Sequence, residues 1–375
     1  MSHTHARTAF RLTGTLAPLF EGLVAIASQT GERSRRTAVA TASGVGRTYA
    51  VIVALAMVAA LLVAAPAGAQ PRLERLAGAD RFETAAAAGE TFGTADAVVL
   101  ATGERPADAL AAAPLARSLG APLLLTSSTS LAAAAAAQLD RLGGPGVWLV
   151  GGEAALSSDV AAAVAQRGTV AGRLSGPNRF ATAAAIATQV GLSPDGEVIV
   201  VNGQDEAFAD ALSAGSFGVL GHTVPVLLTR GEDVPVETAA ALAELAPTTI
   251  HLIGGTAVIS QAVQAALEDA GAATLRHAGA DRYATSAAVN EHLRSRVPAL
   301  FGGEVERTLV TASGEDFPDG LAAGALTGST RPGLLQLVPR DQLDAAGAVV
   351  TLLQQMAGEI DLVTLLGGPA AVSEA

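Results

Sequence analysis

Three arginines, each followed by an aromatic residue, recur along the chain at spacings of 98 and 103 residues. The pairs are Arg81 with Phe82, Arg179 with Phe180, and Arg282 with Tyr283. A guanidinium group is a planar fork of hydrogen-bond donors that suits phosphate or carboxylate oxygens. One interpretation is that each pair contacts an anionic ligand. The alternative is that each arginine pairs with acidic residues of its own repeat and stabilises the fold.

Acidic residues form a second repeated feature, downstream of each arginine. They follow apolar segments predicted to be strands, at the edge where doubly wound sheets usually bind ligands. The members are Glu104 and Asp108, then Asp205, Glu206 and Asp210, then Glu315, Asp316 and Asp319. Because Ca²⁺ and Mg²⁺ take carboxylate ligands, one hypothesis is a calcium or magnesium site built from these residues. In the alternative interpretation, Asp108, Asp210 and Asp319 are helix N-caps.

A double glycine closes each repeat, and a serine follows five residues after the second glycine. The glycines are Gly151-Gly152, Gly254-Gly255 and Gly367-Gly368, and the serines are Ser157, Ser260 and Ser373. A glycine turn before a helix can hold phosphate, but a P-loop would also need a lysine, and this chain has none. The pattern therefore favours a tight strand-to-helix turn with a serine cap.

Residue sets typical of catalysis are absent from the sequence. The histidines of the repeat region, His222, His251, His277 and His292, do not recur at equivalent places. No G-x-S-x-G, H-E-x-x-H or other zinc-binding spacing is present. The repeats also occupy nearly all the length after residue 70, which leaves no room for a separate catalytic domain. We therefore predict no catalytic residues and a non-enzymatic protein.

The repeated features lie between segments with alternating helix and strand patterns. Asp80, Asn178 and Asp281 each precede an alanine-rich segment, as helix-capping residues do. Short β-branched runs that end in glycine, such as residues 97–103, indicate strands buried on both faces. Alternation of such strands with helices predicts an α/β fold of three tandem, small, doubly wound parallel-sheet modules, each of about 100 residues.

Four sequence blocks recur three times in the same order. They begin with LAGADRFETAAAA, LSGPNRFATAAAI and HAGADRYATSAAV, continue through the acidic loops to APLLLT, VPVLLT and PGLLQL, and end with VWLVGGEAALS, IHLIGGTAVIS and LVTLLGGPAAVS. Together these blocks resemble the cell wall-binding repeat type 2 family, whose repeats occur in triplets on surface proteins of Gram-positive bacteria. The resemblance covers residues 72–375. It implies three modules around a pseudo-threefold axis that attach non-covalently to an anionic secondary wall polymer.

The repeats divide the chain into an N-terminal region, 1–69, and repeats at 72–171, 172–274 and 275–375. The third repeat departs from the others in its PGLLQL segment. It also stops at Ala375, where its last helix should begin, so that element is either missing or supplied differently. We expect the third module to be less stable or less competent in binding.

The N-terminal region has the pattern of a secretory signal peptide. Residues 49–65 form an uncharged apolar run, arginines precede it, and Ala67-Gly68-Ala69 follows as a cleavage site. The run is shorter than the roughly 20 residues of a membrane-spanning helix. We expect a secreted protein at the cell wall or cell surface, with an uncleaved membrane anchor as the alternative.

Composition excludes several classes of partner. The net charge is −12, all 23 basic residues are arginine, and the repeats contain no basic patch, which excludes nucleic-acid binding. The chain has no cysteine, so disulfides and cysteine-ligated zinc are excluded. A bound Ca²⁺ or Mg²⁺ would reconcile an acidic protein with an anionic polymer.

Attachment to an anionic wall polymer is the leading hypothesis for function. Linked modules raise the effective concentration of the second and third contacts, so weak individual sites would give firm retention. One alternative is a wall-modifying hydrolase of the amidase type. Another is a soluble protein that binds a small anion or a divalent metal.

Overall fold

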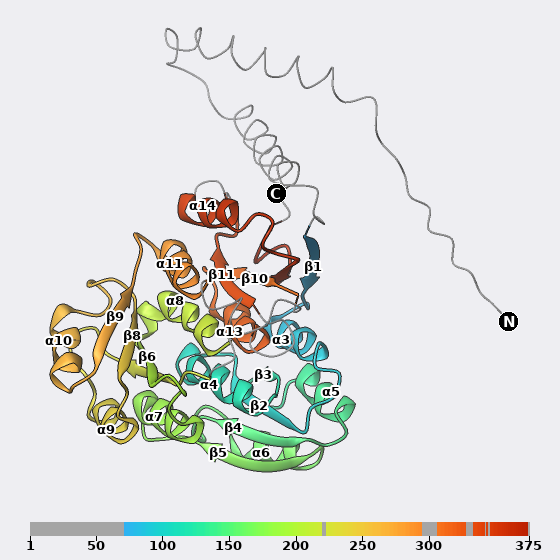
Figure 1. Ribbon diagram of the computed structural model, residues 1–375. Coiled ribbons are helices and arrows are strands. Elements are labelled where there is room, and N and C mark those ends of the chain that lie inside the picture. Colours follow the sequence, from blue (N-terminus) through green and yellow to red (C-terminus); the bar gives the residue numbers. More distant parts are fainter. Residues whose placement is uncertain are drawn as a thin grey trace, which may run out of the picture. The chain divides into compact units, whose positions relative to one another are not determined.

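Figure 1 shows the computed structural model of the chain. The structure describes residues 71–219, 223–294, 306–327, 333–341, 343 and 346–373, all within one compact unit, Ala54–Ala375. These residues form three parallel four-stranded sheets with helices between the strands, which confirms the predicted fold class. No helix in the described ranges is long and apolar enough to cross a bilayer. The predicted signal segment, 49–65 with Ala67-Gly68-Ala69, lies outside the described residues.

The first sheet has the strand order β3-β2-β4-β5, and all neighbouring strands are parallel. The strands are β2 (Ala97–Thr102), β3 (Leu123–Thr126), β4 (Gly146–Val150) and β5 (Thr169–Leu174). The helices are α3 (Arg81–Glu90), α4 (Pro106–Ser118), α5 (Ala133–Arg141) and α6 (Ser158–Ala165). Val98, Val99 and Leu100 of the central strand are fully buried, as expected for a strand covered on both faces.

The second sheet repeats this order as β7-β6-β8-β9. The strands are β6 (Glu197–Asn202), β7 (Val226–Thr229), β8 (Thr249–Ile253) and β9 (Ala273–His277). The helices are α7 (Arg179–Val190), α8 (Phe208–Ala211), α9 (Val236–Leu245) and α10 (Gln261–Asp269), with the 3₁₀ segments η1 (Asp205–Ala207) and η2 (Leu212–Val219). The segment that corresponds to α4 is thus divided among η1, α8 and η2, and the two glycines in η2 lower its helix propensity.

The third sheet has the order β11-β10-β12-β1. The strands from the third repeat are β10 (Thr308–Ser313), β11 (Gly333–Val338) and β12 (Leu362–Leu366), and the helices are α11 (Arg282–Arg294), α13 (Phe317–Leu326) and α14 (Gly347–Gln355). Despite its divergent PGLLQL segment, β11 is buried along its whole length. The fourth strand, β1 (Arg72–Leu76), comes from the other end of the described chain.

Each sheet receives its fourth strand from the segment that opens a different repeat. Strand β5 precedes α7, β9 precedes α11, and β1 precedes α3. In the third sheet, Arg72 pairs with Leu362 and Leu76 with Leu366. The first and last strands of the described region therefore lie side by side (Figure 1).

Three corresponding segments pack against one another at the centre: α4 contacts η2 and α13, and α13 contacts η2. Small residues at one repeated position allow this approach, namely Ala113, Gly215 and Gly324. A Cβ atom on Gly215 would lie 2.7 Å from the Cα atom of Gly324, and a Cβ atom on Gly324 would lie 3.4 Å from the Cβ atom of Ala113. The predicted pseudo-threefold arrangement thus rests on a centre of small side chains.

Candidate functional site

The three repeated arginines begin the helices α3, α7 and α11. Asp80 and Asn178 cap the first two of these helices, and Asp281 accepts a hydrogen bond from the Ala284 backbone N–H, as predicted. Each arginine donates a hydrogen bond to the carbonyl of the glycine that follows the central strand of its own repeat. Arg81 binds Gly103 O at 2.8 Å, Arg179 binds Gly203 O at 2.6 Å, and Arg282 binds Gly314 O.

Arg179 also pairs with the acidic loop of its own repeat. Its Nη1 atom lies 2.6 Å from Oδ1 of Asp205, and Arg179 lowers the pKa of that carboxyl through this hydrogen bond. For Arg179, this ion pair has the form expected if the arginine stabilises its own repeat, whereas the contacts of Arg81 and Arg282 given above are with backbone carbonyls. Contact with an anionic ligand stays a prediction.

A surface pocket of about 270 Å³ lies at the carboxyl ends of β6 and β7. Its lining residues are Arg179, Phe180, Gln204, Asp205 and Arg230. The Arg230 guanidinium lies 4.7 Å from the centroid of the Phe180 ring and 2.6 Å from Oδ2 of Asp233. The pocket thus brings two guanidinium groups and an aromatic ring together at the sheet edge where ligands are expected. Two of the predicted polymer-binding residues, Arg179 and Phe180, lie in this pocket.

The expected N-cap role of Asp108, Asp210 and Asp319 is wrong. The N-caps of α4, α8 and α13 are Arg105, Ala207 and Asp316, and the three aspartates lie in the first turns of these helices. In α4 and α13, a proline in the first turn places the start of the helix ahead of the aspartate.

These three aspartates lie against the double-glycine turns instead. A Cβ atom on Gly151 would lie 2.8 Å from Oδ2 of Asp108, and the turns at Gly254 and Gly367 have the same arrangement with Asp210 and Asp319. Gly151 also has a φ of 104°, so the position needs glycine both for its backbone conformation and for the approach of the carboxylate. The predicted serine caps are confirmed at Ser157 and Ser260, which accept hydrogen bonds from Val160 N and Val263 N.

Burial raises the pKa of each of these aspartates, and the arginine of another repeat opposes that shift. Arg179 acts on Asp108, Arg282 on Asp210, and Arg81 on Asp319. The pKa of Asp319 reaches about 6, because burial and the neighbouring Asp316 outweigh Arg81. The repeated arginines therefore also act electrostatically between modules.

A second set of repeated arginines, Arg75, Arg173 and Arg276, was missed in the sequence. Each lies in the fourth strand of a sheet and donates to the carbonyl of the first glycine of a double-glycine turn. The acceptors are Gly367 O at 2.7 Å, Gly151 O at 2.7 Å and Gly254 O at 2.8 Å. The signal was available, because these arginines have the same 98- and 103-residue spacings as the first set.

The acidic residues predicted to bind Ca²⁺ or Mg²⁺ have contacts within the chain. Glu104 accepts a hydrogen bond from Ser128 N at 3.2 Å, and Glu315 accepts one from Arg340 N at 3.1 Å. Asp205 pairs with Arg179, whereas Asp108, Asp210 and Asp319 lie at the glycine turns. A calcium or magnesium site in these loops stays a prediction.

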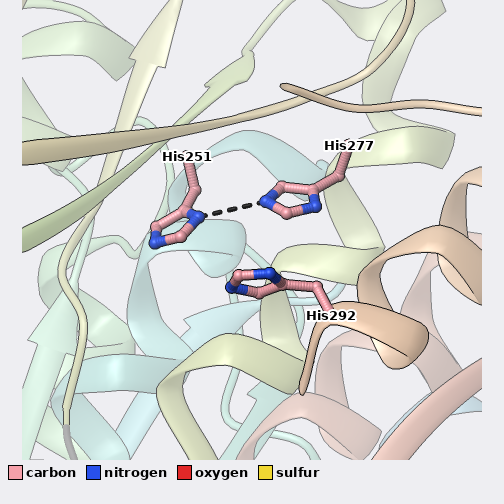
Figure 2. A group of neighbouring side chains, drawn as sticks. All are labelled: His251, His277 and His292. Carbon is pink, nitrogen blue, oxygen red and sulfur yellow. Dashed lines mark hydrogen bonds between the residues drawn. The ribbon is translucent and has the colours of Figure 1, made fainter. Parts of the chain in front are cut away.

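Within the described part of the chain, the group of residues able to surround one ion is a set of histidines, His251, His277 and His292. We call these three residues the histidine cluster (Figure 2). His251 lies in β8, His277 ends β9, and His292 lies in α11. Their nearest ring nitrogens all lie within 4.8 Å of one another, although no role for these histidines was predicted from the sequence.

The histidine cluster is enclosed by apolar and acidic neighbours. The Phe217 ring centroid lies 4.5 Å from that of His251, 5.2 Å from that of His277 and 5.8 Å from that of His292. Oε1 of the buried Glu197 lies 3.4 Å from Nε2 of His251. Burial, reinforced by the two other imidazoles, lowers the pKa of His277 to about 3, so its ring is neutral at neutral pH.

The fold defines a class of proteins assembled from tandem α/β modules whose sheets are completed by a strand of another repeat. The chain belongs to the cell wall binding domain 2 (CWB2) family, whose model matches residues 75–161, 173–264 and 276–375. These three matches include the regions that resembled the family in sequence, and they support cell wall binding.

Two curated proteins of Bacillus subtilis are similar to the chain. N-acetylmuramoyl-L-alanine amidase LytC is 27% identical over 290 residues, which are 77% of this chain and 55% of LytC. The amidase enhancer is 28% identical over 279 residues, which are 74% of this chain and 36% of that protein. The chain therefore spans about half or less of the length of these relatives.

Two solved structures from Clostridium difficile have a similar fold. Cwp6 has a TM-score of 0.67 and 25% sequence identity, and the match covers 80% of this chain and 46% of Cwp6. Cwp8 has a TM-score of 0.64 and 22% identity, with 95% of this chain and 64% of Cwp8 covered. The match to Cwp8 supports the fold alone.

Proposed function

We propose that the chain is a secreted, non-enzymatic protein that attaches non-covalently to an anionic cell wall polymer through its three modules. The observation that carries this proposal is the match of all three repeats to the cell wall binding family. The signal-like sequence at 49–69 supports export to the cell surface.

The surface pocket of the second module is the proposed polymer subsite. Arg179 is held by Gly203 O and Asp205, so its guanidinium is fixed at the pocket wall. Arg230 is held over the Phe180 ring, and its side chain stays 42% exposed. Two positioned guanidinium groups suit a phosphate or carboxylate group of a polymer, and the buried Phe180 ring supports the guanidinium of Arg230 from below.

Co-sedimentation with purified Gram-positive wall tests the proposal. One sample of wall is intact, and a second has been stripped of phosphodiester-linked polymers by acid. We expect the purified protein to be retained on intact wall and lost from stripped wall. Equal failure on both would overturn the wall-attachment proposal, and equal retention on both would overturn the anionic polymer as the target.

A pair of matched variants tests the subsite. Arg230→Gln removes one guanidinium from the pocket, and we expect a several-fold weaker retention at low protein concentration. Arg167→Gln is the control, because Arg167 is also exposed, lies 4.0 Å from the carboxylate of Asp140, and precedes β5 at the opposite end of a sheet. Equal retention of the two variants would remove the pocket from the proposal.

Release of amino or reducing groups from the wall during the same incubation is a second readout. We expect none above a protein-free control. Sustained release would replace the binding proposal with the hydrolase alternative, the activity for which LytC is named.

A further inference from the structure

The histidine cluster is not required by the fold. In the first repeat, the places of His251, His277 and His292 correspond to Trp148, Leu174 and Gln189. At the contact between the third repeat and the first, they correspond to Thr364, Leu76 and Thr91. The same architecture therefore forms without histidine at these places, and the three imidazoles need another explanation.

The geometry of the cluster is close to that of a metal-binding site. Nδ1 of His251 lies 3.0 Å from Nε2 of His277, and Figure 2 shows both nitrogens facing each other above the ring of His292. Two nitrogens bound tetrahedrally at about 2.0–2.1 Å from zinc lie about 3.3 Å apart. The largest separation, 4.8 Å, closes to that value with a side-chain shift of roughly 1.5 Å.

Glu197 provides a second, independent observation. Metal-binding histidines commonly donate the N–H of the other ring nitrogen to a carboxylate, which fixes the tautomer and orients the ring. Oε1 of Glu197 lies 3.4 Å from Nε2 of His251, on the opposite side of the ring from the nitrogen that faces His277. A proton on Nε2 leaves the lone pair of Nδ1 directed into the cluster.

We propose that His251, His277 and His292 bind one divalent transition-metal ion of the zinc class, with Glu197 orienting His251. Imidazole ligands suit zinc and its neighbours, whereas calcium and magnesium prefer oxygen ligands. Three histidines leave a fourth tetrahedral position for water. Of the three ligands, His251 and His277 are buried and His292 is half-buried.

The ion would join two modules. His251 lies in the second sheet on β8, whereas α11, which holds His292, covers β11 of the third sheet. His277 ends β9, the strand that leads directly into α11. Because the unfolded chain has no preformed site, the free energy of metal binding would stabilise this junction.

The test is a zinc titration of the purified protein after treatment with a chelator and dialysis. We expect one Zn²⁺ per chain by calorimetry, a rise in Tm with Zn²⁺, and zinc binding that is undiminished by an excess of Mg²⁺ or Ca²⁺. Substitution by Co²⁺ should give the visible absorption of a tetrahedral nitrogen-ligated ion. This readout does not depend on wall binding, so its failure would leave the proposed function untouched.

Matched variants locate the ion. His292→Ala should weaken zinc binding at least tenfold, and Gln189→Ala, at the corresponding exposed place of α7, should leave it unchanged. Glu197→Gln should keep the stoichiometry and lower the affinity about 10–100-fold. Circular dichroism checks the fold of each variant. Absence of zinc binding at micromolar concentrations, or equal binding by His292→Ala and Gln189→Ala, would overturn the proposal.

Discussion

The first and second modules differ in the side chains that fill the contact between each sheet and the first helix of the following repeat. We call the contact between a sheet and the first helix of the following repeat a seam: β4, β5 and α7 form the first seam, and β8, β9 and α11 form the second. The first seam contains Trp148, which packs so closely on Gly172 that a Cβ atom there would lie 2.7 Å from the indole ring. The second contains the histidine cluster and Glu197. One seam is closed by apolar packing and the other by titratable groups.

The two seams share their contacts to the backbone and differ in the side chains that fill the space between sheet and helix. Both seams keep an arginine on the double-glycine carbonyl, Arg173 in the first and Arg276 in the second. Both also keep a half-buried aspartate against that turn, Asp108 and Asp210. The backbone contacts are therefore common to the seams, whereas the side chains that fill them determine how each responds to solvent conditions.

Removing the indole should have the largest effect. Trp148→Ala leaves a cavity beside Gly172, and we expect a loss of about 3 kcal/mol in the free energy of unfolding. Urea unfolding measures this loss. Circular dichroism is the probe, because Trp148 is the chain's single tryptophan and the variant has no tryptophan fluorescence to follow. His251→Ala removes a smaller ring from the corresponding place and should cost less. A larger loss for His251→Ala would contradict the comparison.

Acid should weaken the second seam. The pKa of His277 is lowered from 6.5 to about 3, so between these values the unfolded chain binds a proton that the native state excludes. Its contribution to stability is intact above pH 6.5 and declines as the pH falls, by about 2 kcal/mol between pH 7 and pH 5. His277→Leu, which introduces the residue found in the other seams, should abolish this decline. Unfolding of the chelator-treated, metal-free protein at several pH values tests it, and an unchanged decline in the variant would refute the assignment.

The third seam, where β12 meets β1 and α3, depends on Arg75. This arginine donates to two carbonyls, Gly367 O at 2.7 Å and Val372 O at 3.1 Å. We expect Arg75→Met to lower the free energy of unfolding by about 2 kcal/mol, because two charged hydrogen bonds are lost. Arg173→Met, which loses the bond to Gly151 O, should cost about half as much. Thermal unfolding of the two variants side by side makes the comparison, and equal losses would speak against it.

Asp319 should give the smallest effect, with the opposite dependence on pH. Its pKa is raised from 3.8 to about 6, so the native state binds the proton more tightly than the unfolded chain. The resulting stability is present below pH 3.8 and is lost as the pH rises through 6, by about 1 kcal/mol between pH 5 and pH 7. Asp319→Asn should remove this loss in the same unfolding experiment. A pH profile identical to that of the unchanged protein would show that Asp319 is already ionised at pH 5.

The sequence predicted the modules well because their signals are local. Buried β-branched runs, alanine-rich helices and the serine caps at Ser157 and Ser260 are specified within a few residues. Prolines at the start of α4 and α13 also marked those helices, and the assignment of Asp108 as a cap overlooked Pro106. The alternation of strands and helices predicted parallel sheets, but it did not predict the order of strands within them.

The seams could not be predicted because they depend on residues far apart in the chain. The pairing of β1 with β12 leaves no local trace, and the three histidines come from three different elements without repetition. Arg75, Arg173 and Arg276 repeat as regularly as the arginines that were recognised. Their partners, however, are backbone carbonyls. Every residue has such a carbonyl, so the sequence does not indicate which one accepts the hydrogen bond.

Strand β1 has a consequence for the order of events during biogenesis. It is the first described strand to leave the ribosome, yet Arg75 must bond to Gly367, 292 positions later in the chain. Until β12 has been made, β1 has no strand to pair with. Such a distant contact makes closure a slow step in folding. The first two sheets contain neither β1 nor β12, so they can form while β1 stays unpaired until synthesis of the chain is nearly complete.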